Sequence, residues 1–91
     1  MTKKPGPIKR DVELAKSIGA NLRRLRLARG HSQRTLAIAL QCTRTCVAWM
    51  ELGHTSVSIQ RVIELACVFD VEAAELFQEL LKETDDDDST G

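Results

Sequence analysis

The sequence is poor in aromatic residues and in proline. It has 91 residues but no tyrosine, one tryptophan and two phenylalanines, and both of its prolines lie among the first ten residues. With so few rings, a core must be built from the aliphatic residues that dominate the 43% hydrophobic content, which suits packed helices. Alternating runs of β-branched residues are also scarce, so a sheet is not expected. The composition therefore favours one small all-α domain.

Features that would indicate a membrane protein or a secreted protein are missing as well. No apolar run approaches the ~20 residues of a membrane-spanning helix. The basic start, MTKKPGPIKR, is not followed by the apolar stretch of a signal peptide. Because the chain has an odd number of cysteines and no such peptide, we expect a reducing cytoplasm, bacterial or phage-encoded, and no membrane partner.

The sequence also lacks the motifs of metal sites and of catalysis. The cysteines form no C-x-x-C pair and the histidines no H-x-x-x-H pair, so no metal ligands are expected. Cys46, Glu51 and His54 could be combined into a catalytic set, but no nucleophile motif or phosphate loop accompanies them. We therefore expect no enzyme and no cofactor.

Charge is unevenly distributed, although 13 basic and 13 acidic residues give a net charge of zero. Up to position 29 there are nine basic and two acidic residues, a net charge of +7, so the remainder carries −7. We expect a flexible basic arm at 1–10, a folded domain at 11–83 and a disordered acidic tail at 84–91. The arm could lie along DNA or only be solvated, and the tail could compete with phosphate or only add solubility.

Apolar residues recur at helical spacing in five segments of the folded domain. Ser32, Thr43 and Ser58 are suited to be N-caps, and Gly53 and Asp70 are suited to end helices. The last segment has a broader apolar surface than one core needs, which suggests a partner. The predicted helices are 11–29, 32–40, 43–51, 58–69 and about 72–83.

The most specific motif runs from Ser32 to Gly53. It reads S-Q-x-x-L-A-x-x-L, then T-R-T-x-V, then E-x-G, and it resembles the Cro/repressor-type (XRE) helix-turn-helix family of bacterial and phage regulators. The resemblance covers about Ile18 to Phe77, and T-R-T-x-V and S-V-S-I are most similar to restriction-modification controller proteins. It implies a compact five-helix, lambda-repressor-like bundle. The chain departs from the family at Gln41, where glycine is usual; a left-handed backbone there would cost roughly 1 kcal/mol relative to glycine.

The resemblance implies that the helix at about 43–51 enters the major groove while the preceding helix lies across the DNA backbone. Its outward residues are Arg44, Thr45, Ala48 and Trp49. Arg44 is suited to the O6 and N7 acceptors of guanine, with a phosphate contact as the alternative. Thr45 could reach a thymine methyl or a phosphate. The indole of Trp49 could contact sugar or thymine methyls, or pack against a neighbouring helix.

Phosphate contacts are expected on both sides of this helix. The resemblance implies that Gln33 clamps a phosphate, and backbone N–H groups around His54, Thr55 and Ser56 could hold a second one. Cys46 lies near the expected DNA face, although close packing is an alternative reason for a small residue there. The candidate DNA-binding residues are Gln33, Thr43, Arg44, Thr45, Cys46, Ala48, Trp49, His54 and Thr55.

The resemblance also implies an ion pair between Arg26 and Glu51, with a structural role rather than a DNA contact. One short helix reads only a few base pairs, so we expect a homodimer on a palindromic operator in double-stranded DNA. No sensor domain is evident, so no small-molecule effector is expected. The alternative is a protein-interaction module, such as an antitoxin or adaptor, with secondary DNA binding. The candidate dimer-interface residues are Ile63, Phe77, Leu80 and Leu81.

Overall fold

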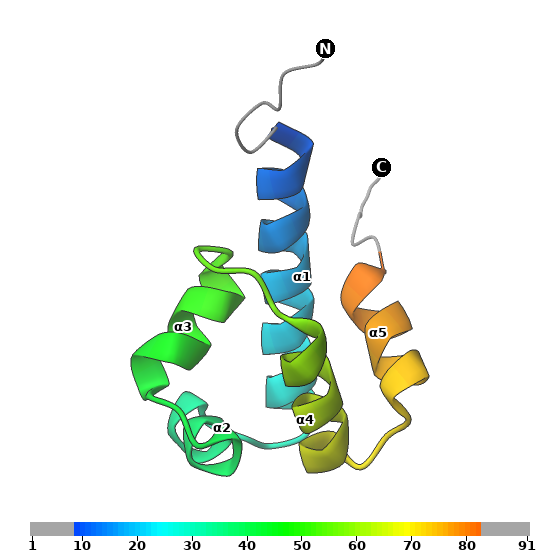
Figure 1. The fold of residues 1–91 in the computed structure, drawn as a ribbon. Coiled ribbons are helices and arrows are strands. Elements are labelled where there is room, and N and C mark those ends of the chain that lie inside the picture. Colours follow the sequence, from blue (N-terminus) through cyan, green and yellow to red (C-terminus); the bar gives the residue numbers. More distant parts are fainter. Residues whose placement is uncertain (1–8, 83–91) are drawn as a thin grey trace.

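The computed structural model describes residues 9–82, which form a bundle of five helices (Figure 1). The predicted acidic tail and residues 1–8 of the predicted arm lie outside the described part. Lys9 and Arg10 were assigned to the arm by the sequence pattern, but they form the first turn of a helix, because nothing after Pro7 disfavours helical backbone. The helices are α1 (Lys9–Ala28), α2 (Gln33–Leu40), α3 (Arg44–Leu52), α4 (Ile59–Phe69) and α5 (Ala73–Leu81).

Three helices begin at the predicted hydroxyl caps. The side chains of Ser32, Thr43 and Ser58 accept hydrogen bonds from backbone N–H groups of the first turn, at 3.0, 3.0 and 3.1 Å. Each bond satisfies a donor that has no partner within the helix. The start of α5 differs, because its N-cap, Glu72, makes no side-chain cap bond.

Left-handed residues end the three middle helices. Gln41, Gly53 and Asp70 have φ values of 58°, 80° and 59° and follow α2, α3 and α4. The left-handed backbone at Gln41 is less favourable for glutamine than for glycine, so this residue has the steric cost expected from the sequence. Asp70 adopts the same conformation more readily, because aspartate is enriched in the left-handed region.

Every helix contributes to one apolar core, which is aliphatic except for Phe69 and Met50. α1 is the longest helix and lies against α3 on one side and α5 on the other (Figure 1). Its N-terminal part extends beyond the other helices, so Leu14, the first residue of an apolar stripe that continues with Ile18, Leu22 and Leu25, is exposed. The stripe joins the core only from Ile18 onward. The buried core residues are Leu22, Leu36, Ala37, Leu40, Val47, Met50, Val62, Leu65, Ala66, Phe69, Leu76 and Leu80.

Two glycines allow α1 and α3 to approach each other closely. A Cβ at Gly19 would lie 2.3 Å from the backbone oxygen of Met50 and 2.5 Å from that of Glu51. A Cβ at Gly53 would lie 2.7 Å from the Cα of Lys16. These distances are shorter than van der Waals contact, so side chains at either position would push the end of α3 away from α1.

Within residues 9–82, no helix has the length and apolar character needed to cross a membrane. The same part of the chain contains no group of three histidine, cysteine or acidic side chains arranged to bind a metal ion.

Candidate DNA-recognition site

The helix α3 has one buried face and one exposed face. Val47, Met50 and Glu51 are buried against the other helices. Arg44 and Thr45 are exposed at the start of the helix, and Ala48 is partly exposed one turn later. The residues that the sequence placed on the outer side of this helix are therefore available to a ligand.

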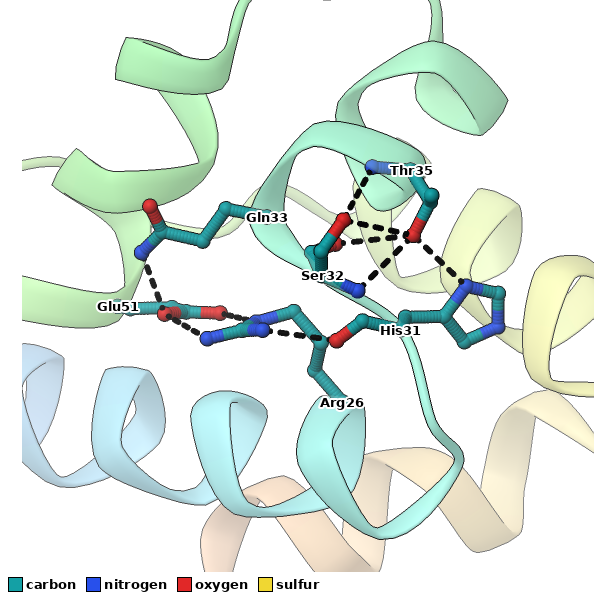
Figure 2. Close-up of polar contacts among 6 residues, drawn as sticks. All are labelled: Arg26, His31, Ser32, Gln33, Thr35 and Glu51. Atoms are coloured by element: carbon teal, nitrogen blue, oxygen red, sulfur yellow. Dashed lines mark hydrogen bonds and ion pairs between the residues drawn. The ribbon is translucent and has the colours of Figure 1, made fainter.

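A buried carboxylate fixes α3 to its neighbours (Figure 2). The Nε of Arg26 donates to Oε2 of Glu51 at 2.5 Å, and Nη2 donates to Oε1 at 3.1 Å. The side chains are 6% and 2% exposed, so this ion pair is almost fully removed from water. Nη1 of Arg26 donates to the backbone oxygen of His31 at 2.8 Å. Arg26 and Glu51, which the resemblance pairs, thus connect α1, the loop before α2 and the end of α3.

Gln33 also belongs to this network. Its Nε2 donates to Oε1 of Glu51 at 3.0 Å, so the carboxylate accepts bonds from three donors. Gln33 is the first residue of α2, where backbone N–H groups have no partner within the helix. The bond to Glu51 uses only one of the two hydrogens on Nε2. The second hydrogen and the helix N-terminus leave donors suited to a phosphate.

The outer face of α3 is largely apolar beyond its first turn. Trp49 is 51% exposed, so this large residue has about half of its surface in solvent. Leu52, at the end of the helix, is 59% exposed and was not singled out from the sequence. The spacing could have identified it, because Arg44, Ala48 and Leu52 lie four residues apart and therefore on one side of a helix.

Cys46 and Thr43 lie at the edge of this face rather than at its centre. Cys46 is partly buried and packs against the core beside Cys42. Burial raises the pKa of the Cys42 thiol, and the adjacent Cys46 raises it further. The hydroxyl of Thr43 is already used as the cap of α3.

The loop after α3 offers fewer donors than the sequence suggested. The N–H of His54 donates to the backbone oxygen of Trp49 at 2.9 Å, as part of the turn that ends α3. The prediction that this group clamps a phosphate is therefore wrong. The residues Thr55 and Ser56 are exposed, and in the described part of the chain their N–H groups donate to no backbone oxygen.

Three of the four residues expected at the dimer interface are exposed on α4 and α5, and the fourth is buried. Ile63, Phe77 and Leu81 are 52%, 44% and 41% exposed, respectively. Leu80 is 1% exposed and packs in the core. Its assignment to the dimer interface is therefore wrong, because a side chain buried within its own chain cannot contact a partner. Ile59, one turn before Ile63, is 66% exposed and extends the face.

Polar side chains that cap helix C-termini were missed by sequence reasoning. Asn21 is fully buried, and its Nδ2 donates to the backbone oxygens of Leu80 and Lys82 at 2.7 and 2.8 Å. Its Oδ1 accepts a hydrogen bond from Arg24. A polar residue three positions after Ile18 on the apolar stripe was the available signal.

Two arginines have the same capping role. Arg29 donates to the backbone oxygen of Phe69 at the end of α4, at 2.8 Å, and lies over the Phe69 ring. Arg61 donates to the oxygen of Leu40 at the end of α2, at 3.2 Å. Both charges therefore serve the fold, and for Arg29 this means that the basic excess of the first 29 positions overstates the charge left for a ligand.

The family and the solved structures agree with this geometry. Residues 17–80 match the model of a helix-turn-helix domain family. The restriction-modification controller protein C.AhdI from Aeromonas hydrophila is similar, with 40% identity, a TM-score of 0.63 and a match covering 71% of this chain and 97% of that one. The clp gene regulator ClgR from C. glutamicum is 25% identical, with a TM-score of 0.66 and coverage of 74% and 87%. A search of curated proteins found no match. The chain therefore belongs to the XRE-type helix-turn-helix family of DNA-binding transcriptional regulators.

Proposed function

We propose that the chain regulates transcription as a homodimer that occupies a palindromic operator, with α3 in the major groove. The observation that carries this proposal is the division of α3 into a buried face, held by Glu51, and a free face that begins with Arg44. A helix that is fixed from behind can present the same side chains to base edges at every encounter.

The candidate DNA contacts have distinct roles in this proposal. Arg44 donates to O6 and N7 of a guanine, because its planar fork matches that pair of acceptors. Thr45 contacts a base edge or phosphate beside it. Gln33 and the N-terminus of α2 hold one phosphate, and the N–H groups of the exposed residues Thr55 and Ser56 hold a second. The phosphate contacts position the helix, and the base contacts specify the sequence.

Dimerisation is supported by the exposed apolar face of α4 and α5. Four large apolar side chains on these helices are more than two-fifths exposed: Ile59, Ile63, Phe77 and Leu81. Covering such a face with a second copy removes it from water, and a two-fold axis then places the two α3 helices about 34 Å apart, one turn of DNA. The similarity to a restriction-modification controller protein supports a role of this kind in a bacterial or phage cytoplasm, with control through protein concentration.

DNA binding is tested by titrating duplexes from the chain's own promoter, and random duplexes, at several salt concentrations, with Trp49 emission and gel mobility as readouts. We expect a preference for promoter DNA and an affinity that falls steeply with salt, because phosphate binding releases counterions. Arg44→Lys keeps the charge but loses the fork, so it should remove the preference more than the affinity for random DNA. Absence of binding to either duplex at low salt would instead favour the protein-interaction module.

The dimer is tested by sedimentation of Ile63→Ser and Leu27→Ser. The two side chains are matched, at 52% and 51% exposed, but Leu27 lies on α1. We expect Ile63→Ser to lower self-association by about tenfold or more, and Leu27→Ser to leave it unchanged. Equal behaviour of the two variants, or a monomeric parent at concentrations that saturate DNA, would contradict the proposed interface.

A further inference from the structure

The free face of α3 offers unusually little hydrogen-bonding capacity. After Arg44, the exposed or partly exposed side chains along this face are Thr45, Ala48, Trp49 and Leu52. Asparagine, glutamine, lysine and aspartate, which read the polar edges of bases, do not occur in α3. The only acidic residue of the helix, Glu51, is buried and accepts three hydrogen bonds, so it cannot accept one from a cytosine amino group.

Beyond Arg44 and the hydroxyl of Thr45, the side chains of this face are apolar. Ala48 presents a methyl group, Leu52 an isobutyl group and Trp49 half of an indole whose N–H can only donate. Each of these would lose free energy if it displaced water from a polar base edge without replacing its hydrogen bonds. In the major groove, the one apolar group on a base edge is the C5-methyl of a pyrimidine, which thymine carries and which 5-methylcytosine carries after modification.

We infer that specificity beyond the contacts of Arg44 and Thr45 comes from C5-methyl groups of pyrimidines, which pack against Trp49 and Ala48. This inference rests on the proposed function, since it assigns the ligand of the same helix face. Arg44 and Leu52 are eight residues apart, about 12 Å along the helix, so the methyl groups lie within about four base pairs of the guanine. The half-site is therefore a guanine close to one or more methylated pyrimidines.

The inference is tested on a duplex selected from a random pool with the full-length protein. Deoxyuridine is substituted for each thymine of the site in turn, because uracil lacks the methyl group but keeps the same hydrogen-bonding atoms. Burial of one methyl group corresponds to about fourfold in affinity, so we expect a loss of about this size at one or more positions near the guanine. Thymines outside the site serve as the control and should show no effect.

A second arm distinguishes the two sources of the methyl group. The sensitive thymine·adenine pair is replaced by cytosine·guanine, with and without a C5-methyl on the cytosine. Recovery of affinity by the methylated cytosine would show that the methyl group alone is read, from either base. If only thymine binds well, the source is thymine, with its neighbouring groups also required.

A matched pair of variants assigns the effect to α3. Trp49 and Leu27 are both 51% exposed, so alanine at either position should leave the fold intact, which thermal unfolding verifies. Trp49→Ala should reduce the discrimination between thymine and uracil toward onefold while keeping the requirement for guanine, and Leu27→Ala should change neither. The inference would be overturned, with the proposed function intact, if the parent bound its selected site equally well with thymine and with uracil. An unchanged preference for thymine over uracil in Trp49→Ala would have the same consequence. Failure to select any preferred sequence would overturn the proposed function as well.

Discussion

The two sides of this molecule both expose apolar side chains, but they differ in what supports the exposed helix from behind. On the α3 side, the exposed face is backed by a buried carboxylate that accepts hydrogen bonds from Arg26 and Gln33. On the side formed by α4 and α5, the exposed face is apolar, and the ion pair that α4 makes within residues 9–82, between Arg61 and Glu64, is partly exposed. Polar contacts have directional geometry and so fix the orientation of a helix, whereas apolar contacts favour burial with less constraint on angle. The face of α3 is therefore suited to recognising a ligand, and the face of α4 and α5 is suited to forming an interface with a partner.

Removing the buried carboxylate of Glu51 should have the largest effect on stability. Glu51→Ala leaves Arg26 charged and 5% exposed without its partner, so we expect the free energy of unfolding in urea to fall by about 4 kcal/mol. The matched control is Glu64→Ala, which breaks a pair whose side chains are 26% and 35% exposed and should cost less than about 1 kcal/mol. Equal costs would mean that the Arg26–Glu51 pair is not protected from solvent. Replacing both Arg26 and Glu51 by methionine should cost less than Glu51→Ala alone.

The two leucines at the end of α5 should differ sharply in their effect on stability. Leu80→Ala creates a cavity in the core and should lower the free energy of unfolding by about 3 kcal/mol. Leu81 is 41% exposed, so Leu81→Ala should cost less than about 1 kcal/mol in the monomer but weaken self-association. Urea unfolding at low protein concentration and sedimentation separate the two effects. The reverse order of stability would place Leu81 rather than Leu80 inside the fold.

The close crossing of α1 and α3 can be tested at Gly19. Gly19→Ala brings a methyl group against two backbone oxygens, which cannot move without shifting the helix, so we expect a cost of about 2 kcal/mol and weaker DNA binding. Gly30→Ala is the control, because Gly30 has a φ of +79° but no atom within 4 Å of an added Cβ. It should cost about 1 kcal/mol, from backbone strain alone, and leave DNA affinity unchanged once folded. A DNA affinity that is unaffected in folded Gly19→Ala would show that the spacing of α1 and α3 is unimportant for recognition.

The smallest expected change is a gain in stability at the turn between α2 and α3. Gln41 is held at a φ of 58°, which glycine adopts without steric cost. Glycine also has a larger conformational entropy in the unfolded chain, which offsets part of the gain. We therefore expect Gln41→Gly to raise the free energy of unfolding by about 0.5 kcal/mol. Thermal unfolding should therefore shift upward by a few degrees. A downward shift would indicate that the Gln41 side chain contributes contacts that outweigh the backbone strain.

The sequence predicted the local features of the fold well, because short-range chemistry determines them. Hydroxyl residues before apolar repeats identified the caps at Ser32, Thr43 and Ser58, and helical spacing identified the outward positions of α3. The phase of α5 was harder to predict. Leu76 and Leu80 form one apolar row and Phe77 and Leu81 the next, so helical periodicity alone cannot tell which row faces the core.

Features that depend on long-range geometry could not be predicted either. The role of Asn21 requires that the end of α5 lie beside the middle of α1, 59 residues apart in sequence for the bond to Leu80. The need for glycine at position 19 arises only from the distance between α1 and the end of α3. The N–H of His54 is an exception, because the glycine that ends α3, Gly53, is the pattern of a turn in which the N–H of the next residue bonds back to the helix.

The central claim is that the free face of α3 reads DNA sequence while the network behind it holds the helix in place. The most direct measurement is the ratio of affinities for a selected duplex and a scrambled duplex of equal length, compared between the parent and Arg44→Lys by fluorescence anisotropy at several salt concentrations. We expect the ratio to fall by at least about tenfold in Arg44→Lys, with the affinity for scrambled DNA and its salt dependence nearly unchanged. An unchanged ratio would show that α3 does not read the bases through Arg44 and would contradict this assignment.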